Sequence, residues 1–404
     1  MVKARALCTV VWILIIAVGA AHAQKADSFG ADVAFLRKRI EVIVLASGSG
    51  QAKVAVAPAW QGRVVTSTAG GDEGPSYGWI NRALAVAGKP LPHFNPLGGE
   101  DRLWLGPEGS QFSIFFRGGE AFDLEHWQTP APFDTDRWQV AAQDVDSVRF
   151  TRAVQLTNRA GTRLDLAIDR TIRMVSDAGV REACGRVPGK GLRWVGFQSE
   201  NRLTNKGAAK WSRQGGLLSI WSMGMFTPSP ATTVVIPLAV TARPGVVNDV
   251  YFGRVPPDRL ATKGKTVFFR ADGQQRGKIG VRPPDARPVL GSYDAANKVL
   301  TVVWYTLPKG RHPYVNSLWR ELKDPFSGDV VNSYNDGPTT PGGKPLGPFY
   351  ELESSSPGAE LAPGAALVHT HRTLHLQGDA AALDVMARAC LGVGVADIEA
   401  AFKR

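Results

Sequence analysis

The sequence predicts an all-β, mainly antiparallel fold in which two large sheets stack face to face as a β-supersandwich, with a few short helices near the termini. Two observations support this. From Lys53 to Gln377, apolar and polar residues alternate with period two, and clusters of Gly, Pro, Asn and Asp separate these runs. The 404-residue chain has no repeat at a fixed period, which disfavours propellers and solenoids. The sequence therefore predicts one large domain.

The clearest predicted strand covers residues 163–174, where Leu164, Leu166 and Ile168 alternate with charged residues, so that one face of the strand is apolar. Helical periodicity occurs only near the ends, over 31–42 and over 380–402, where Gly392 and Gly394 interrupt it. The other predicted strands cover residues 54–56, 63–67, 111–116, 148–157, 192–204, 217–221, 232–237, 266–270, 299–306, 349–354 and 367–377.

The first 23 residues have the pattern of a signal peptide. Lys3 and Arg5 form a basic start, residues 10–18 are apolar, and Ala21-His22-Ala23 is a small-x-small cleavage site. The apolar run is shorter than the ~20 residues that cross a bilayer, so we predict no membrane span. We expect a periplasmic or secreted protein, cleaved near Ala23. Residues 24–404 then form one domain with its core at about 34–377 and a helical tail at 380–404.

Charge and cysteine content exclude several classes of protein. The formal net charge of +11 becomes +9 when Lys3 and Arg5 are removed. Because the basic residues are spread along the chain, no nucleic-acid partner is predicted. Cys184 and Cys390 remain after cleavage, and the sequence leaves their pairing open, as it does the oligomeric state. No cofactor or metal is predicted, because the cysteines and histidines lack a complete ligand spacing.

A glycine-rich segment, residues 98–109, is the densest polar constellation. Glycine allows a backbone to approach a ligand closely. The Glu100, Asp101 and Arg102 side chains offer directional hydrogen bonds, and Trp104 offers an apolar face, a combination that suits a sugar. The alternative is a turn in which Arg102 is ion-paired internally. His93 and His126 flank the segment, either as proton-transfer groups or as partly buried structural histidines.

Two further segments carry candidate site residues. In the strand at 349–354, Glu351 and Glu353 point to one face about 6.6 Å apart. If that face is buried, the two like charges raise one pKa, and one carboxyl then suits acid or base work; the alternative is a solvated pair. The long connection at 314–338 is rich in aromatic and amide side chains, which favours a functional loop. Asn335 and Asp336 are either ligand contacts in it or a turn before Gly337.

On these residues the chain resembles a secreted bacterial family of unknown function that is related to the galactose mutarotase-like superfamily. In aldose 1-epimerases a Leu-Glu-Thr-Gln-like strand precedes a Leu-x-Pro-Gly turn, and its glutamate is the general base. Leu352-Glu353-Ser354-Ser355 before Leu361-Ala362-Pro363-Gly364 is similar, so the resemblance implies that role for Glu353. The motifs that carry the family resemblance are residues 98–109, 278–280, 291–294, 332–338 and 350–354.

Two departures from the aldose 1-epimerase pattern concern the acid. No histidine adjoins Gly98-Gly99, and none follows Asn205 before His312. Ring opening needs a base on the anomeric hydroxyl and an acid on the ring oxygen, so the usual histidine acid must have a substitute. We assign Glu100 or His93 as the partner of Glu353.

The sequence therefore predicts an exported carbohydrate-active protein that acts on a sugar or glycan by acid/base proton transfer. The alternatives are a non-catalytic carbohydrate-binding module and a structural envelope protein. We also expect residues 98–109 and 350–354 to meet at one concave face, since ligand pockets collect convergent polar groups. The predicted catalytic residues are Glu353, Glu100 and His93, and the predicted carbohydrate contacts are Arg102, Trp104, Asp101, His126, Asn335, Asp336 and Glu351.

Overall fold

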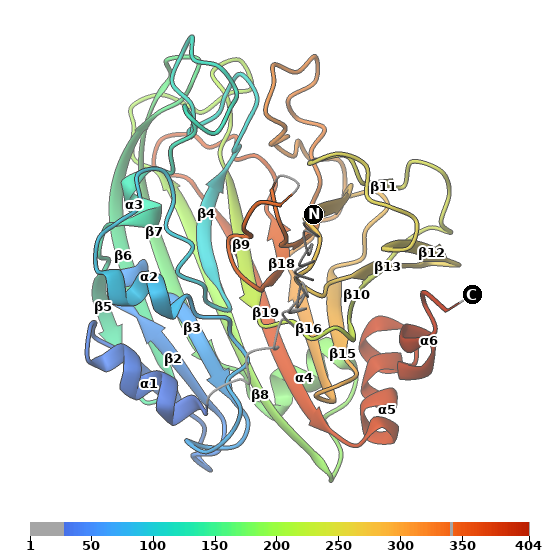
Figure 1. Cartoon of the computed structure of the whole chain (residues 1–404). Coiled ribbons are helices and arrows are strands. Elements are labelled where there is room, and N and C mark those ends of the chain that lie inside the picture. Colours follow the sequence, from blue (N-terminus) through green and yellow to red (C-terminus); the bar gives the residue numbers. More distant parts are fainter. Residues whose placement is uncertain (1–27, 340–341, 404) are drawn as a thin grey trace, which may run out of the picture.

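The computed structural model describes residues 28–339 and 342–403, and their strands form three antiparallel sheets (Figure 1). The ten-stranded sheet has the order β12 (Leu260–Lys263), β13 (Thr266–Arg270), β10 (Thr232–Pro237), β15 (Val289–Asp294), β16 (Val299–Tyr305), β19 (Ala366–Gly378), β8 (Leu192–Asn205), β7 (Arg163–Met174), β6 (Ser147–Thr157), β5 (Gln139–Gln143). The six-stranded sheet has the order β11 (Val247–Asn248), β14 (Gly277–Val281), β17 (Val331–Asn335), β18 (Tyr350–Ser355), β9 (Ser219–Phe226), β4 (Arg102–Gly106). The third sheet is β1 (Ile43–Ala46), β2 (Lys53–Ala57), β3 (Arg63–Thr68).

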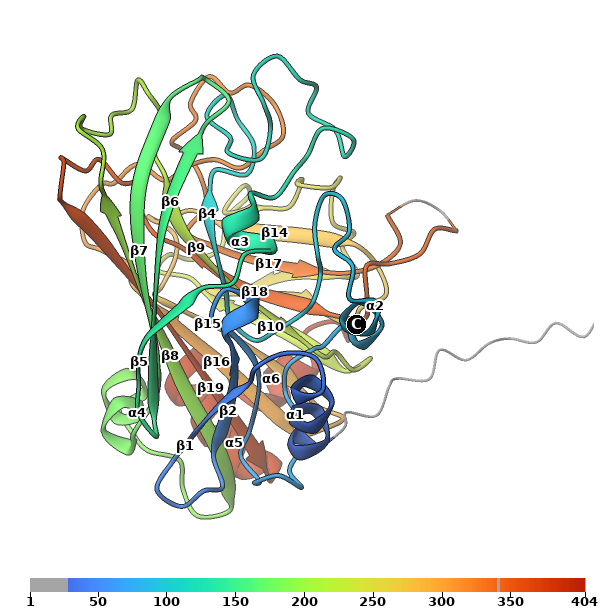
Figure 2. The same cartoon turned by 90° about the vertical axis from the view of Figure 1, so that its left-hand side faces the viewer.

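The two large sheets form the two layers of the molecule (Figure 2). An isolated bridge between Val64 and Asp101 joins β3 to the start of β4, so the three-stranded sheet extends the six-stranded layer. Every second side chain along these strands points inward, and the inward-pointing apolar side chains form the core between the layers. In β7, for example, Leu164, Leu166 and Ile168 are buried while their neighbours are not. The predicted all-β, mainly antiparallel fold is confirmed.

The predicted strand at 111–116 is wrong. The Ser113 hydroxyl bonds to the backbone of this segment in place of a neighbouring strand. Its Oγ donates to the Glu108 carbonyl and accepts from Phe115 N. Phe115 and Phe116 are both buried, which is incompatible with an alternating strand. The expected loop at 314–338 is wrong in part, because residues 331–335 form β17 between β14 and β18.

Helices near the ends of the chain are confirmed as α1 (Phe29–Arg37), α5 (Ala380–Leu391) and α6 (Val395–Glu399), with a break at Gly392, whose φ is 76°. Short internal helices were not predicted, because a few residues with a side-chain cap give no periodic signal; Ser176, for instance, caps the helix that follows it. These elements are η1 (Pro58–Trp60), α2 (Arg82–Ala87), α3 (Ala131–Asp134) and α4 (Asp177–Cys184).

Helices α4, α5 and α6 pack on one face of the ten-stranded sheet through Val180, Leu383 and Ile398, one from each helix. A disulfide between Cys184 and Cys390 ties α4 to α5, which answers the pairing that the sequence left open. Among the described residues, no helix is both long enough and apolar enough to span a bilayer.

Replacing both cysteines (Cys184→Ser with Cys390→Ser) should lower the free energy of unfolding by about 2–5 kcal/mol, because the disulfide closes a long loop in the unfolded chain. Urea unfolding measures the effect. Reductant should shift the midpoint of the wild-type protein and leave that of the double variant unchanged. Equal midpoints for the two proteins under oxidising conditions would contradict this prediction.

Candidate functional site

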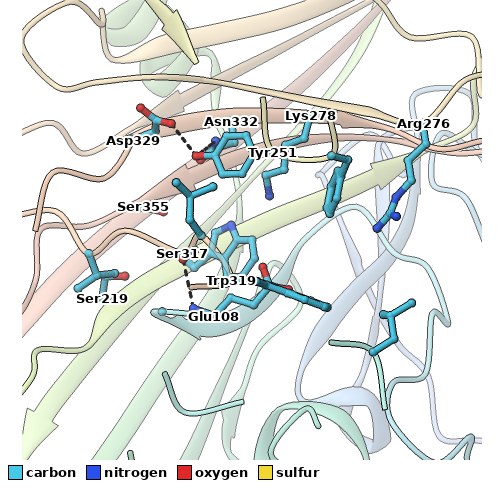
Figure 3. A pocket seen from close by; sticks show the side chains of 16 residues that line it. Glu108, Ser219, Tyr251, Arg276, Lys278, Ser317, Trp319, Asp329, Asn332 and Ser355 are labelled. Carbon is cyan, nitrogen blue, oxygen red and sulfur yellow. Dashed lines mark hydrogen bonds between the residues drawn. The ribbon is translucent and has the colours of Figure 1, made fainter. Parts of the chain in front are cut away.

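A cavity of about 170 Å³ lies against the six-stranded sheet (Figure 3). Ser222 and Ser354 bond to residues of the ten-stranded sheet, so their strand neighbours Trp221 and Ser355, which line the cavity, point to the opposite face. We call this face the outer face. Strand residues Ser219, Trp221, Lys278, Asn332 and Ser355 form one side of the cavity. Loop residues close the rest of it, among them Glu108, Tyr251, Phe252, Arg276, Trp319 and Asp329.

Lys278, Glu353 and Trp221 form a buried hydrogen-bonded group beside the cavity. The Lys278 ammonium and the Trp221 indole N–H both donate to Glu353 Oε2, each at 2.9 Å. The Glu353 side chain is 0% exposed and that of Lys278 is 10% exposed. Lys278 and Trp221 therefore face the cavity, while the carboxylate that holds them lies behind.

A second ion pair on the same face joins Arg102 Nη2 to Glu351 Oε1 at 2.9 Å. Burial raises the pKa of Glu351 to about 7; the Arg102 charge opposes this shift, and the Glu353 charge adds to it. Glu353 Oε1 is buried and has no hydrogen-bond donor among the residues that the structure describes. A proton on Glu351 would supply one, because the two carboxyls are hydrogen-bond neighbours. The predicted effect of paired glutamates on one pKa is thus present.

The pKa values of the two titratable groups that face the cavity, Glu108 and Lys278, are both raised, but for different reasons. Burial raises the pKa of the half-buried Glu108 carboxyl above its usual value, although the nearby Lys278 charge lowers it. Burial disfavours the charged form of Lys278, but the charges of Glu353, Glu108 and Glu351 outweigh that effect and raise its pKa. Lys278 is therefore held protonated, while Glu108 titrates closer to neutral pH than an ordinary glutamate.

The far wall of the cavity carries a tyrosine in a hydrogen-bonded cluster. The Tyr251 hydroxyl donates to Asp329 Oδ2 at 2.6 Å and accepts from Asn332 Nδ2 at 3.1 Å. Asn248 Nδ2 also donates to Asp329 Oδ2, at 3.0 Å. Burial raises the pKa of Asp329, and burial together with Asp329 raises that of Tyr251. The cluster fixes the tyrosine ring in the wall of the cavity, beside Asn332 and Lys278 (Figure 3).

Four of the predicted site residues lie on the outer face next to the cavity. Strand β9 lies between β4 and β18, and its Met223 pairs with Arg102 on one side and with Glu353 on the other. The predicted segments 98–109 and 350–354 therefore lie on either side of β9. Glu351 pairs with Arg102, whose guanidinium lies 4.3 Å from the Trp104 ring centroid. The Trp104 indole is buried and donates to the Phe133 carbonyl. These residues support the lining and do not themselves form it.

Glu100 and Asp101 lie between the two large sheets, so their predicted role at the cavity is wrong. The Glu100 carboxylate accepts from Ser67 and is paired with His375 of β19 at 2.9 Å, whereas Asp101 is paired with Arg170 of β7 at 2.9 Å. Both acids are 0% exposed. Glu100 and Glu353 are thus on opposite faces of the six-stranded sheet.

The glycines that precede Glu100 are required by packing and not by a ligand. A Cβ at Gly98 would lie 2.0 Å from the Trp79 carbonyl oxygen, and one at Gly99 would lie 2.6 Å from the Arg63 side chain. Their φ angles are 92° and 109°, in the region that favours glycine.

The remaining four predicted residues also lie away from the cavity lining. His93 is exposed in a loop, and His126 is paired with Asp123 at 2.7 Å on the surface. Asn335 is buried and bonds to loop backbone, including the Gln275 carbonyl. Asp336 is buried and accepts hydrogen bonds from Tyr334 and Gly347 N. A turn before Gly337 was the alternative for this pair; Asn335 instead ends β17.

The lining residues themselves were not singled out from the sequence. Glu108, Lys278 and Asn332 fall inside the segments that carry the family resemblance, and Trp319 falls inside the long connection, so motif membership was the available signal. Tyr251 and Arg276 lie outside those segments and had none. In the described part of the chain, no group of three or more His, Cys, Asp and Glu side chains is placed to hold a metal. The two neighbouring histidines of β19, His369 and His371, both bond to Ser354.

The model of the Family of unknown function (DUF6786) matches residues 27–402. This chain belongs to that family. The family membership predicted from the resemblance is confirmed. No curated protein matches the sequence.

Solved structures with similar folds include three bacterial proteins. A galactose mutarotase-like protein from Lactobacillus casei has 10% identity and a TM-score of 0.46, over 83% of this chain and 100% of that chain. A galactose mutarotase related enzyme from Lactobacillus acidophilus has 9% identity and a TM-score of 0.46, over 83% and 97%. A protein from Synechocystis has 12% identity and a TM-score of 0.49, over 84% and 97%.

Replacing Lys278 by Met should destabilise the fold by about 3–5 kcal/mol, because it leaves the buried Glu353 carboxylate without its cation. Adding Glu353→Gln to Lys278→Met should restore most of that loss, since the uncompensated charge is then gone. Urea unfolding of the two single variants and the double variant measures the coupling. Additive effects of the two single changes would contradict a buried ion pair.

The pKa of Glu351 predicts a loss of stability with rising pH. The folded state holds the Glu351 proton up to about 7, against 4.5 for an ordinary glutamate. This contribution to stability is fully present below the lower value and is lost as the pH rises through the higher one. Between about pH 5 and pH 8, the wild-type protein should lose about 1–3 kcal/mol relative to Glu351→Gln, which cannot ionise.

Urea unfolding at several pH values makes this comparison. The matched control is Glu182→Gln, whose side chain is 76% exposed, and its pH profile should run parallel to that of the wild-type protein. Parallel profiles for wild-type and Glu351→Gln would show instead that Glu351 ionises normally in the folded state.

Proposed function

We propose that this protein is an exported, carbohydrate-active protein that acts on a sugar or glycan by acid/base proton transfer in the outer-face cavity. One observation carries the proposal. A protonated lysine, Lys278, and a carboxyl with a raised pKa, Glu108, face the same aromatic-lined hollow. A proton donor and a carboxyl that can accept a proton, placed at one site, are suited to acid and base roles.

Aromatic rings in the lining suit the apolar faces of a sugar ring. Trp319 is half-buried, stacks on Trp127 and borders the cavity beside Glu108. Trp221 and Phe252 add two further aromatic surfaces, and Asn332 and Ser317 add polar groups for hydroxyls. At about 170 Å³ the cavity is smaller than the usual ~300–1,000 Å³ of drug-sized ligand sites. One sugar unit or the end of a glycan chain fits this scale.

In this proposal Lys278 and Glu108 touch the sugar, and Glu353 acts through Lys278. Its carboxylate holds the ammonium and the Trp221 indole in place, so Glu353 is a positioning residue and the direct base role implied by the resemblance passes to Glu108. Lys278 donates a proton to a sugar oxygen, and Glu108 removes one from a hydroxyl. Figure 3 places both side chains at the hollow.

A non-catalytic carbohydrate-binding module is the second candidate. It is favoured because no histidine is among the lining residues of this cavity, whereas the usual acid of the aldose 1-epimerase pattern is a histidine. In that case the same lysine and carboxyl orient hydroxyl groups without transferring protons. Turnover of a bound sugar distinguishes the two functions.

Export is supported by the Cys184–Cys390 disulfide, because such bonds persist in oxidising compartments and are rare in the cytosol. The predicted signal peptide and the cleavage near Ala23 lie outside the described residues. A periplasmic or secreted location therefore remains part of the proposal.

Glu108→Gln keeps the size of the side chain and removes its proton-accepting group. With the chain from Gln24 and a panel of monosaccharides and oligosaccharides, NMR should detect both binding and turnover. We expect turnover to fall by roughly 10²–10⁴ in this variant while affinity changes little. Lys278→Arg should also lower turnover, because it keeps the charge beside Glu353 but donates protons poorly.

His93→Asn is the matched control for these variants, since His93 is exposed and away from the cavity; its turnover should equal that of the wild-type protein. Binding without turnover in the wild-type protein would favour the binding module. Turnover that survives in both Glu108→Gln and Lys278→Arg would overturn the proposed roles, and a complete lack of sugar binding would overturn the proposed function.

A further inference from the structure

The cavity contains a second cation, and we propose that this residue, Arg276, binds an oxyanion carried by the sugar, so that the ligands of this site are acidic sugars such as uronates. The inference rests on the proposed function and narrows its substrate class.

Arg276 and Lys278 extend from one strand to the same hollow. Arg276 precedes β14 by one residue and Lys278 is the second residue of that strand. Residues two apart on a strand project to the same side, about 6.6 Å apart. Both side chains line the cavity, and Figure 3 shows both descending toward it. One wall of the cavity is therefore cationic.

These two cations differ in their partners. The Lys278 ammonium is bound by Glu353, whereas Arg276 forms no ion pair with any residue that the structure describes. Its Nε is buried and has no hydrogen-bond partner in the described part of the chain. The guanidinium carbon lies 3.8 Å from the Phe252 ring centroid, which orients the plane of the group. A stacked guanidinium keeps the N–H groups at its edge available to a ligand.

Nearby acids leave the charge of Arg276 uncompensated. Asp336 is close enough for Arg276 to lower its pKa, but burial raises that pKa overall, and the Asp336 oxygens already accept from Tyr334 and Gly347 N. Elsewhere at the site, Lys278 is paired with Glu353, and Asp329 accepts hydrogen bonds from Tyr251 and Asn248 and forms no ion pair with Arg276 among the described residues. The Arg276 end of the cavity thus carries excess positive charge.

The geometry of a guanidinium selects the ligand chemistry. Its planar fork forms two parallel hydrogen bonds to one carboxylate or phosphate group. A hydroxyl of a neutral sugar offers no such pair of acceptors and no charge. Carboxylate on a uronic acid and phosphate on a sugar ester share this chemistry, and the experiment below separates them.

Calorimetric titration of the chain from Gln24 tests the inference, with glucuronate and galacturonate, glucose 6-phosphate, and neutral glucose and galactose as probes. We expect the uronates to bind about ten- to hundredfold more tightly than the neutral sugars. Arg276→Gln should abolish this preference and leave the affinity for neutral sugars unchanged, while Arg276→Lys should retain part of it. Because Arg276 forms no ion pair with a described residue, Arg276→Gln loses only the stacking on Phe252, and the unfolding midpoint should fall only slightly.

Arg181→Gln is the matched control. Arg181 is exposed on α4, which packs on the ten-stranded sheet, so this variant removes the same net charge far from the cavity and should keep the preference. A preference for glucose 6-phosphate that Arg276→Gln removes would support the oxyanion site and assign it to phosphate. Equal binding of neutral and acidic sugars, or a preference that persists in Arg276→Gln, would overturn the inference alone. A wild-type protein that binds none of these sugars would overturn the proposed function itself.

Discussion

The buried ion pair between Arg170 and Asp101 fixes how the two layers of this protein meet. Both side chains are 0% exposed, and a buried charge in that position requires a counter-charge and hydrogen bonds. Arg170 meets this demand by donating to Asp101 and to the Gly62 carbonyl, and its Nη1 reaches Asn201 at 2.7 Å. A residue of β7 is thereby tied to the residue just before β4. The position of β4 in turn places Arg102 next to Glu351 and carries the chain on to Glu108.

A polar layer between the sheets surrounds this ion pair. His375 contacts Glu100, and Ser354 bonds to both His369 and His371. Burial lowers the pKa of His369 to about 3 and also lowers that of His371, so neither histidine carries a charge at neutral pH. These groups join β19 to the six-stranded layer and specify which side chains stand opposite one another. They belong to the interior, where no ligand reaches them.

Strand β18 divides the structural and chemical roles between the two faces of one sheet. Leu352 and Ser354 point inward, to the core and to the histidines, while Glu351 and Glu353 point outward to Arg102 and Lys278. The outer face holds its charges in two ion pairs, which leaves Glu108 and Arg276 as the groups able to respond to a ligand. Loops over that face supply the aromatic walls, so the cavity depends on segments that lie far apart in the chain.

Local chemistry in the sequence determined much of this structure. Period-two alternation is enough to define β7 and β19, because burial on one face of a strand is a property of neighbouring residues. It also places Glu351 and Glu353 on one face. The sequence could not tell which layer Glu100 would meet, nor that Gly98 and Gly99 accommodate Trp79 and Arg63. It could not place Lys278 against Glu353 or leave Arg276 without a partner. Tertiary structure decided these matters, because the energy of a buried charge depends on which distant strand or loop supplies its counter-charge, and alternation along one strand carries no information about that partner.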